Sequence, residues 1–389
     1  MSSKTMKFVI GRLGQFRRVR KALEGTDNVI WVHSSSFGEF EEVRPVICAI
    51  KAAHPECKIL VTFFSPSGYE HLKDDAIADF VFYLPLDFPW NAWRFVKLVH
   101  PSRVIVSISD YWLFFLWELR RRRIPTYLVS ARFLPTMNYF KPRGFLHRDA
   151  FRTCFTHIFV KTEPSVEVLR NAGITNVSYA GDPRVERVRA IAAEEWSDAV
   201  VERWSGGRKV FVAGSTLPDE DDECVIALAN ANPDDKFLLI PHEADEAELM
   251  HLRSSIEGRS VLYSEAGDDV AGAQVLIVDV VGKLSRIYRY GFASFVGGGF
   301  CGIAPHSVIE PAAYGIPVSF GPIFGYQMHC QRMIDAGAAV AVKDRDAICE
   351  WYSRLKSDPD YTEAMGIAAA EYCRKGSGIA EKLAAEIMS

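Results

Sequence analysis

The sequence lacks any uninterrupted apolar run of about 18 residues, the length that predicts a membrane-spanning helix. Its eight cysteines are scattered, and they form neither a Cys-x-x-Cys pair nor a His/Cys spacing typical of a metal site. No secretory signal peptide is visible. These absences predict that no segment present here spans a bilayer, that the thiols are free and mostly buried in a reducing compartment, and that no metal is bound.

Acidic residues are missing from the first 23 positions, which carry seven Lys and Arg residues. Residues 1–188 hold 27 basic and 18 acidic side chains, a net of +9, whereas residues 189–389 hold 18 and 31, a net of −13. The two halves are therefore expected to meet different partners. The basic half suits anionic lipid, nucleic acid or a phosphorylated acceptor.

Short apolar runs alternate with helical patterns along the chain, which predicts parallel sheets covered by helices. Expected helices include 41–53, 90–99, 113–122, 164–172 and a tail over 361–387. Expected strands are 29–33, 58–64, 80–84, 103–108, 126–130 and 157–160 in the first half, and 210–213, 237–240, 260–262, 275–278, 293–296, 317–320 and 338–342 in the second.

The alternation is interrupted by a polar stretch that ends in Ser205-Gly206-Gly207. We therefore expect a basic, membrane-proximal segment over 1–28, a Rossmann-like domain over 29–188, a linker over 189–208 and a second Rossmann-like domain with a helical tail over 209–389. Two such domains leave a cleft between them, and ligands of open α/β sheets bind beyond the carboxyl ends of the strands. Such a cleft suits a donor in one domain and an acceptor in the other.

The most informative motif is a run of three glycines directly after the expected strand 293–296. Gly298 and Gly299 let the backbone approach a bound group, and a helix expected to begin near His306 offers N–H donors to an anion. Glu310, about one turn into that helix, suits the hydroxyls of a ribose. This arrangement predicts a nucleotide site. The structural alternative is a tight turn whose glycines serve only packing.

A dinucleotide fingerprint is the other alternative, because Gly297-x-Gly299-x-x-Gly302 matches it. That fingerprint calls for an acidic residue at the end of the next strand. The next strand ends in Gly321-Pro322 instead, which disfavours a nicotinamide cofactor. No cofactor is expected.

Other strands of the second half also end in polar turns. Ser215 and Thr216 offer hydroxyl and N–H donors to a phosphate, and Pro241-His242 follows the next strand. Lys283, after Gly282, could pair with an anion, although a lone lysine more often faces solvent.

In the first half, Ser36 and Gly38 precede Glu39 at the carboxyl end of the first strand. A carboxylate there is placed to act as a general base, and its bland alternative is a helix-terminal acid that complements the macrodipole. A second helix-start turn holds Ser65, Ser67 and Gly68. Asp110 is a second candidate carboxylate whose alternative is an N-cap.

Aromatic and basic residues mix over 111–152, including Arg132, a pattern that suits a membrane interface or RNA. Most of the apolar run 111–117 is expected to be core, because it is too short to span a bilayer. RNA is the least favoured partner, and we expect no nucleic acid.

Taken together, these turns resemble the 3-deoxy-D-manno-octulosonic acid (Kdo) transferases of lipopolysaccharide synthesis. The resemblance lies in the 31–39 turn, Tyr83-Leu84-Pro85-Leu86-Asp87, Leu128-Val129-Ser130-Ala131-Arg132, and the pattern HxxxEPAxxGxPVxFGP within 297–322. It implies a GT-B glycosyltransferase with two Rossmann-like domains that uses CMP-Kdo, inverts the anomeric centre and needs no metal. It also implies a lipid A precursor as acceptor, at the cytoplasmic face of the bacterial inner membrane.

The resemblance implies a role for each matching position. Glu39 matches the base, and Asp110 matches a glutamate of the family, shortened by one methylene. The expected donor-binding residues are Ser215, Thr216, Pro241, His242, Gly282, Lys283, Gly298, Gly299, His306, Ser307 and Glu310. Lys283 and Ser307 depart from the family, which commonly has Glu and Asn at these positions. The expected acceptor-binding residues are Ser36, Gly38, Ser65, Ser67, Gly68 and Arg132.

Two alternatives stay open at this point. One is another GT-B enzyme with a UDP donor, either a lipid A disaccharide synthase-like transferase or a sugar 2-epimerase. The other is a catalytically silent lipid-binding scaffold. In each case we expect an anionic membrane partner, met peripherally through the basic N-terminus or through an anchor not present in this sequence.

Overall fold

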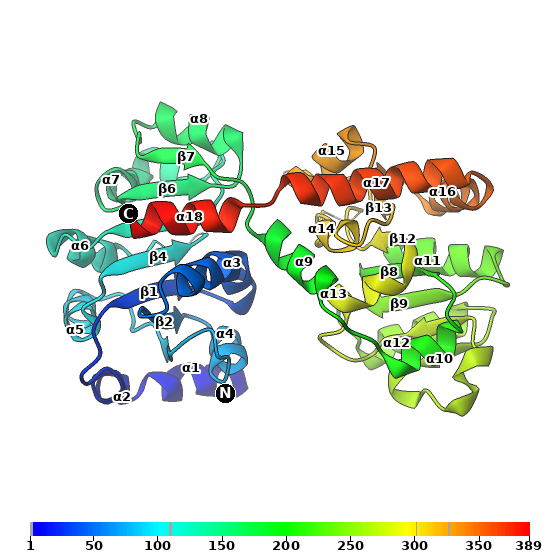
Figure 1. Ribbon diagram of the computed structural model, residues 1–389, viewed down its shortest axis with the longest axis horizontal. Helices are drawn as coiled ribbons and strands as arrows, with labels where there is room; N and C mark the ends of the chain where they lie inside the picture. The colour runs from blue at the N-terminus through cyan, green and yellow to red at the C-terminus, as the bar shows by residue number, and fades with distance from the viewer. Residues whose placement is uncertain (1–2, 109–110, 301, 326) are drawn as a thin grey trace. The chain divides into compact units, whose positions relative to one another are not determined.

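The computed structural model describes residues 3–108, 111–300, 302–325 and 327–389. The chain divides into two compact units (Figure 1). Unit 1 comprises residues up to Arg187 together with Gly376–Ser389, and unit 2 comprises Val188–Lys375. Each unit is built around one parallel seven-stranded sheet.

Unit 1 has the strand order β3-β2-β1-β4-β5-β6-β7. All its strand pairs are parallel, and β1 lies between β2 and β4. The strands are β1 (Val29–Ser34), β2 (Lys58–Phe63), β3 (Phe80–Tyr83), β4 (Arg103–Ser107), β5 (Thr126–Ala131), β6 (His157–Val160) and β7 (Val177–Tyr179). The first six strands were predicted from the sequence. Strand β7, which is only three residues long, was not.

The helices of unit 1 cover both faces of its sheet, because buried strands alternate their side chains between two apolar layers. Ile30 and Val32 pack with α3 and α18, whereas Trp31 packs on the other face with α5 and α6. The helices are α1 (Ser3–Arg12), α2 (Gln15–Ala22), α3 (Phe37–Ala53), α4 (Pro66–Leu72), α5 (Pro89–Val99), α6 (Leu113–Arg121), α7 (Phe145–Thr153), α8 (Glu163–Asn171) and α18 (Ile379–Met388), with short 3₁₀ turns η1 (Asn138–Phe140) and η2 (Pro142–Gly144).

Unit 2 has the strand order β10-β11-β9-β8-β12-β13-β14. The strands are β8 (Val210–Thr216), β9 (Phe237–Pro241), β10 (Ser260–Leu262), β11 (Val275–Ile277), β12 (Gly291–Val296), β13 (Val318–Phe320) and β14 (Ala339–Ala341). Its helices are α10 (Ala199–Ser205), α11 (Glu220–Ala231), α12 (Glu246–Ser255), α13 (Leu284–Ile287), α14 (Ile309–Ala312), α15 (Met328–Asp335), α16 (Arg345–Ser357) and α17 (Pro359–Lys375), with turns η3 (Tyr263–Glu265), η4 (Asp268–Gly272) and η5 (Tyr288–Tyr290).

The domain boundaries differ from the predicted ones at three places. The helical tail is split between the units: α17 belongs to unit 2, whereas α18 packs on α3 of unit 1 (Figure 1). Leu383 and Ile387 bury against that layer, and Arg103 Nε donates to Ile387 O at 2.7 Å. A break at Gly378, with φ of 82°, lets the chain leave α17 and start α18.

The predicted linker over 189–208 is largely helical and belongs to unit 2. It holds the end of α9 (Arg184–Ala193) and all of α10, whose Val201 and Trp204 are fully buried. The basic segment 1–28 forms α1 and α2, which pack on α4 and α5 within unit 1. In both 1–28 and 189–208, apolar side chains are spaced along helices. The many charged residues between them made this helical pattern hard to recognise in the sequence.

No helix in the described part of the chain is long and apolar enough to cross a bilayer. The cysteines that the structure describes are free thiols, and five of them are buried. Burial raises the pKa of Cys224, Cys330 and Cys373 to about 12, which keeps these thiols protonated and unreactive.

Candidate functional site

The three glycines that follow β12 form a tight turn, here called the glycine turn (residues 297–299). Gly298 and Gly299 have φ of 95° and 98°, which only glycine adopts readily. A Cβ on Gly298 would lie 2.7 Å from Ala304 O, and one on Gly299 would lie 2.6 Å from Gly321 O. Both positions therefore require glycine because neighbouring backbone packs against them, which is the packing alternative, and the approach of a ligand to this turn stays a prediction.

The helix after the glycine turn begins later than predicted. It was expected near Pro305 and His306, but α14 starts at Ile309 and contains only four residues. His306 N donates instead to Gly297 O at 3.0 Å, which ties His306 to the glycine turn rather than to a helix. The predicted start of this helix is therefore wrong by about three residues, and His306 and Ser307 lie in the loop before α14.

Three turns that the sequence singled out meet at the carboxyl edge of the second sheet. His242 N donates to Thr216 O at 2.9 Å, and the ring of His242 stacks on that of His306 with centroids 4.3 Å apart. Thr216 Oγ1 and His306 Nε2 are both buried without a hydrogen-bond partner among the described residues. Buried polar atoms are nearly always paired in native proteins, so these two indicate a place for a ligand.

The electrostatics of this edge keep His306 neutral. Burial, and secondly the charge of His242, lower the pKa of His306 to about 4. A neutral imidazole has one nitrogen that donates and one that accepts. His306 Nε2 can therefore either donate a hydrogen bond to a phosphate or sugar oxygen or accept one from a hydroxyl.

Asp221, on the first turn of α11, holds the glycine turn through a hydrogen bond. Its role was not predicted from the sequence. It is 2% exposed, and its Oδ2 accepts from Gly298 N at 2.7 Å and from Leu217 N at 2.9 Å. Burial raises its pKa to about 6, and the two backbone donors oppose that shift. One carboxylate oxygen thus joins the loop after β8 to the glycine turn.

Asp222 and Glu248 form a second acidic feature that the sequence did not reveal. They lie on α11 and α12, are 1% and 7% exposed, and have three oxygens without a hydrogen-bond partner among the described residues. Burial, and secondly the charge of neighbouring carboxylates, raise the pKa of each to about 7. These groups are therefore partly protonated near neutral pH.

Lys283 and Glu310, two other predicted donor-binding residues, lie in different surroundings. Lys283 Nζ lies 2.8 Å from Asp198 Oδ2 and also above the ring of Tyr263, so its charge is already matched within unit 2. Glu310 is half-buried on α14. Burial, and secondly the charge of Glu310, raise the pKa of Tyr288 well above its usual value.

In unit 1, Glu39 forms a capping box at the start of α3. Its Oε2 accepts from Ser35 N at 2.7 Å and from Ser36 N at 3.1 Å, and Glu39 N donates to Ser36 Oγ. The structural alternative for Glu39 is therefore present, and its role as a base stays a prediction. Gly38 lies inside α3, and a Cβ added there would have no neighbouring atom within 4 Å.

The neighbouring turn before α4 is connected to the Glu39 turn. Ser65 N donates to Ser35 O at 2.9 Å, and Ser65 Oγ lies 2.8 Å from Ser67 Oγ. Gly68 is buried, and a Cβ there would lie 2.1 Å from the ring of Phe63. Its absence of a side chain therefore serves packing, whereas the two serine hydroxyls lie at the surface.

A buried polar chain behind these turns was also missed. Trp112 Nε1 donates to His33 Nε2 at 3.0 Å, and His33 Nδ1 lies 2.9 Å from Thr62 Oγ1. The indole donor assigns the ring proton of His33 to Nδ1. Arg132 follows β5 at the same sheet edge and is half-buried, and Asp110 lies outside the described residues.

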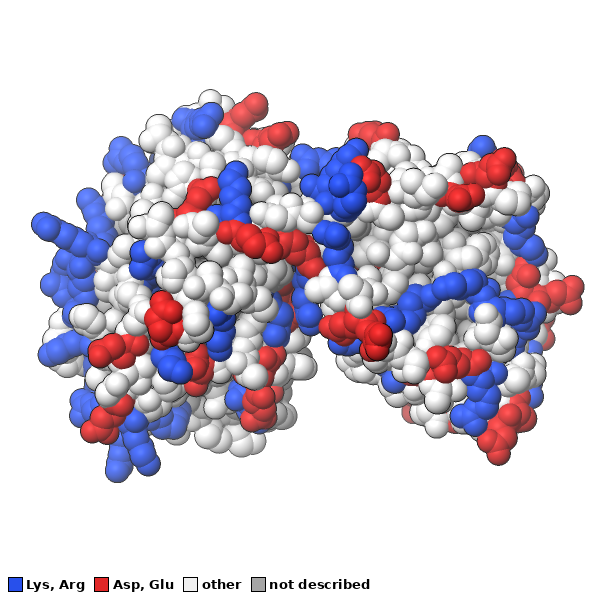
Figure 2. Space-filling model, in the orientation of Figure 1, with Lys and Arg blue, Asp and Glu red and all other residues white. Residues whose placement is uncertain are grey.

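The aromatic run before and within α6 is mainly core, as predicted. Tyr111, Phe115 and Leu116 are buried. Among the described residues of unit 1, the exposed large hydrophobic side chains lie elsewhere: Met6, Ile10, Leu13, Leu86, Phe88, Trp90, Phe145, Leu146 and Tyr179. Figure 2 shows Lys and Arg side chains gathered over the part of unit 1 that carries α6.

A family model described as 3-deoxy-D-manno-octulosonic-acid transferase (kdotransferase) matches residues 10–187. Curated relatives of the same name extend the likeness into unit 2: that of Aquifex aeolicus is 27% identical over 312 residues, 78% of each chain, and that of Haemophilus influenzae is 25% identical over 371 residues, 91% of this chain and 85% of its own. The chain is similar to the Kdo transferases over most of its length.

The likeness indicates a glycosyltransferase, and the fold of the chain is of the GT-B type. Among solved structures, UDP-GlcNAc 2-epimerase from Neisseria meningitidis has a TM-score of 0.67, with 16% identity over 92% of this chain and 99% of its own. At that identity the likeness shows the fold alone.

Proposed function

We propose that this protein is a Kdo transferase that moves Kdo from CMP-Kdo to a lipid A precursor and inverts the anomeric centre. The observation that carries the proposal is the pair of buried, unpartnered atoms Thr216 Oγ1 and His306 Nε2 beside the glycine turn. A nucleotide phosphate or sugar would supply partners for both atoms, and the glycine turn leaves no side chain between it and the ligand.

In this proposal the donor occupies the carboxyl edge of the second sheet. The phosphate lies against Ser215 and Thr216 beside the glycine turn, and the leaving group is CMP. The loop of Pro241 and His242 meets the cytosine, whereas His306, Ser307 and Glu310 hold the ribose. Gly282 completes the rim, and Lys283 acts there through its contact with Asp198.

The acceptor occupies the carboxyl edge of the first sheet. Glu39 takes the proton from an acceptor hydroxyl, whose oxygen forms a bond to the anomeric carbon of Kdo while the bond from that carbon to the phosphate oxygen breaks. The electron pair leaves with CMP. Two backbone N–H groups fix the orientation of the Glu39 carboxylate before the acceptor arrives. Asp110 is the second carboxylate, and Ser36, Ser65, Ser67 and Arg132 contact the acceptor.

The lipid acceptor places the protein at an anionic membrane, the cytoplasmic face of the bacterial inner membrane. The first 23 residues carry seven basic and no acidic side chains. Such a segment is attracted to anionic lipid by about 1 kcal/mol per basic residue near the surface. Exposed Phe88 and Trp90 add aromatic side chains of the kind enriched at membrane interfaces.

The test compares Glu39→Gln with Glu41→Gln, using CMP-Kdo and a lipid A precursor. Glutamine preserves a capping box but cannot accept the proton, so kcat should fall by about 10²–10⁴-fold, the usual contribution of a general base. Glu41 lies on the same helix in ion pairs with Arg44 and Arg187, and its variant should keep wild-type turnover. Near-full turnover in Glu39→Gln would disprove the assignment of the base.

The donor half is tested separately. CMP should raise the melting temperature of the wild-type protein more than UDP does, and Thr216→Val should remove most of that increase. An equal response to CMP and UDP would favour a UDP-dependent enzyme. Binding to anionic vesicles without any CMP release from CMP-Kdo would favour a silent scaffold.

A further inference from the structure

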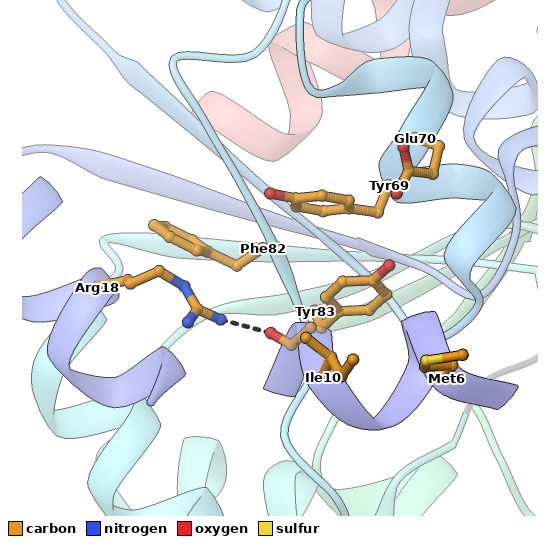
Figure 3. Close-up of a pocket in the computed structure, with 8 residues that line it drawn as sticks. Met6, Ile10, Arg18, Tyr69, Glu70, Phe82 and Tyr83 are labelled. Carbon is orange, nitrogen blue, oxygen red and sulfur yellow. Dashed lines mark hydrogen bonds between the residues drawn. The ribbon is translucent and has the colours of Figure 1, made fainter. Parts of the chain in front are cut away.

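Unit 1 contains a cavity of about 600 Å³ that none of the predicted roles uses (Figure 3). It lies between the N-terminal helix pair, α4 and the edge strand β3. Its walls are formed mainly by Met6 and Ile10 of α1, Tyr69 of α4, and Phe82 and Tyr83 of β3. A volume of this size falls within the range of about 300–1,000 Å³ for small-molecule sites.

The wall that α1 contributes is fixed to the sheet. Arg12 donates from Nε to Leu84 O at 2.9 Å and from Nη2 to Phe64 O at 2.8 Å. Gly11 brings the helix so close to β3 that a Cβ would lie 2.2 Å from the ring of Tyr83. On the opposite side, the rings of Tyr69 and Tyr83 stack with centroids 4.6 Å apart, so the cavity has preformed aromatic walls.

The two ionic side chains at the cavity already have hydrogen-bond or ion-pair partners within the protein. Arg18 donates to the carbonyls of Gly11 and Leu13, and Figure 3 shows its guanidinium directed toward the helix backbone. Glu70 lies 3.0 Å from the ammonium of Lys73. The N–H donors of Arg18 and the carboxylate of Glu70 thus have partners within the protein, and the rest of the surface offered to a ligand is aromatic and aliphatic.

The mouth of the cavity is also apolar. Met6 and Ile10 are 50% and 57% exposed, and Leu13, one turn further along, is 64% exposed. This stripe stands within a segment that carries only basic charges. A basic segment with an exposed apolar stripe is typical of a surface that meets anionic amphiphiles.

The cavity adjoins the predicted acceptor turn. Tyr69 belongs to the same short helix, α4, whose first turn carries Ser67 and follows Ser65. A molecule with a polar head at those hydroxyls and an apolar chain would have a place for the chain beside Tyr69. The polar and apolar parts of one acceptor can thus contact neighbouring parts of α4.

We propose that this cavity binds one acyl chain of the acceptor lipid. The proposal rests on the proposed function, because it takes the acceptor to be a lipid. An acyl chain needs apolar surface and shape but no hydrogen-bond partner, and the walls described above supply both. The cavity would then select acylated acceptors and direct their sugar hydroxyl toward the Glu39 edge.

The kinetic test measures kcat/KM with a tetra-acylated lipid A precursor and with the same sugar phosphate after complete deacylation. The wild-type value should be at least tenfold higher for the acylated acceptor. Ile10→Asp places a charge at the mouth of the cavity and should remove that preference, with less than a twofold effect on the deacylated acceptor. Leu13→Asp, an equal change of charge on the same stripe but outside the cavity, is the matched control and should retain the preference.

Equal use of both acceptors by the wild-type protein, or an equal loss for both in Ile10→Asp, would overturn the proposal. Melting temperatures of the two variants should match the wild type, because both side chains are exposed. Loss of preference in Leu13→Asp as well would assign the effect to general lipid attraction and not to the cavity.

A direct binding test separates this proposal from the proposed function. The wild-type protein is irradiated with a lipid A precursor that carries a diazirine in one acyl chain, and the labelled peptides are identified by mass spectrometry. Label at Tyr69, Phe82 or α1, absent in Ile10→Asp, supports the cavity even if no Kdo is transferred. Label confined to other surfaces overturns it even if transfer is observed.

Discussion

Asp221 should be required for nucleotide binding although it need not touch the nucleotide. Its Oδ2 accepts hydrogen bonds from Leu217 N and Gly298 N, and the side chain is 2% exposed. Asp221→Ala leaves both N–H groups buried without a partner. Since each buried, unsatisfied group costs about 1–3 kcal/mol, the variant should lose about 2–6 kcal/mol of stability.

Asp221→Asn is the matched variant, because a single oxygen accepts both bonds. The amide oxygen of asparagine can occupy the same position, so both N–H groups keep an acceptor. The bonds become neutral and weaker, but the variant no longer buries a charge. We therefore expect Asn to stay within about 1 kcal/mol of the wild type at pH 7, well above Ala.

The assay combines urea unfolding with calorimetric titration of CMP. Asp221→Ala should unfold at a lower urea concentration and bind CMP at least tenfold more weakly than the wild type. Asp221→Asn should recover most of the stability and most of the affinity. Ala with wild-type stability and affinity would refute the reasoning. So would an Asn variant as defective as Ala, because that result would require the charge and not the oxygen.

The pH dependence of this pair has a definite sign. Burial raises the folded-state pKa of Asp221 to about 6 from its ordinary 3.8. The folded protein therefore binds more protons than the unfolded chain between these values, and the stability contributed by Asp221 decreases as the pH rises through that window. The stability of Asp221→Asn relative to the wild type should increase from pH 4 to pH 6, as measured by urea unfolding at each pH.

Three further outcomes follow from individual residues. Asp222→Asn should be more stable than the wild type at pH 8 and lose that advantage toward pH 4. The reason is that burial raises the pKa of Asp222 to about 7. Urea unfolding at both pH values measures the difference. Gly299→Ala should destabilise the protein by roughly 1–3 kcal/mol or more and abolish CMP binding in calorimetry, because its φ is 98° and its Cβ would meet Gly321 O. Gly38→Ala should raise thermal stability by about 0.5–1 kcal/mol, because the residue lies inside α3 with open space around it.

The sheets and the polar turns at their carboxyl edges were predictable because their signals are local. Continuous apolar runs mark strands buried on both faces, and the polar residues at their ends, such as Thr216 and His242, fall together whenever parallel strands share one carboxyl edge. The conformation of Gly298 and Gly299 was predictable for the same reason, since the backbone requirement acts on the glycine itself.

Features that depend on distant parts of the chain were not predictable in this way. The position of α18 is decided by Leu383 and Ile387 meeting α3, some 340 residues away in sequence. Asp221 resembles any acid in the first turn of a helix until Gly298 is placed beside it. The sequence suggested that Lys283 binds an anion, but the fold pairs its ammonium with Asp198.

Glu39 shows how a structural and a proposed catalytic role can reside in one side chain and still be separated. Its Oε2 holds the Ser35 and Ser36 N–H groups, and such capping is worth about 0.5–2 kcal/mol. Glu39→Ala removes both the cap and the base, whereas Glu39→Gln removes only the base. The difference in unfolding free energy between the two variants therefore measures the cap, and equal loss of turnover in both would show that the carboxylate acts in the reaction itself. If turnover instead followed stability, so that Gln stayed active and Ala did not, Glu39 would serve only to shape the turn, and the proton would have to leave through another group.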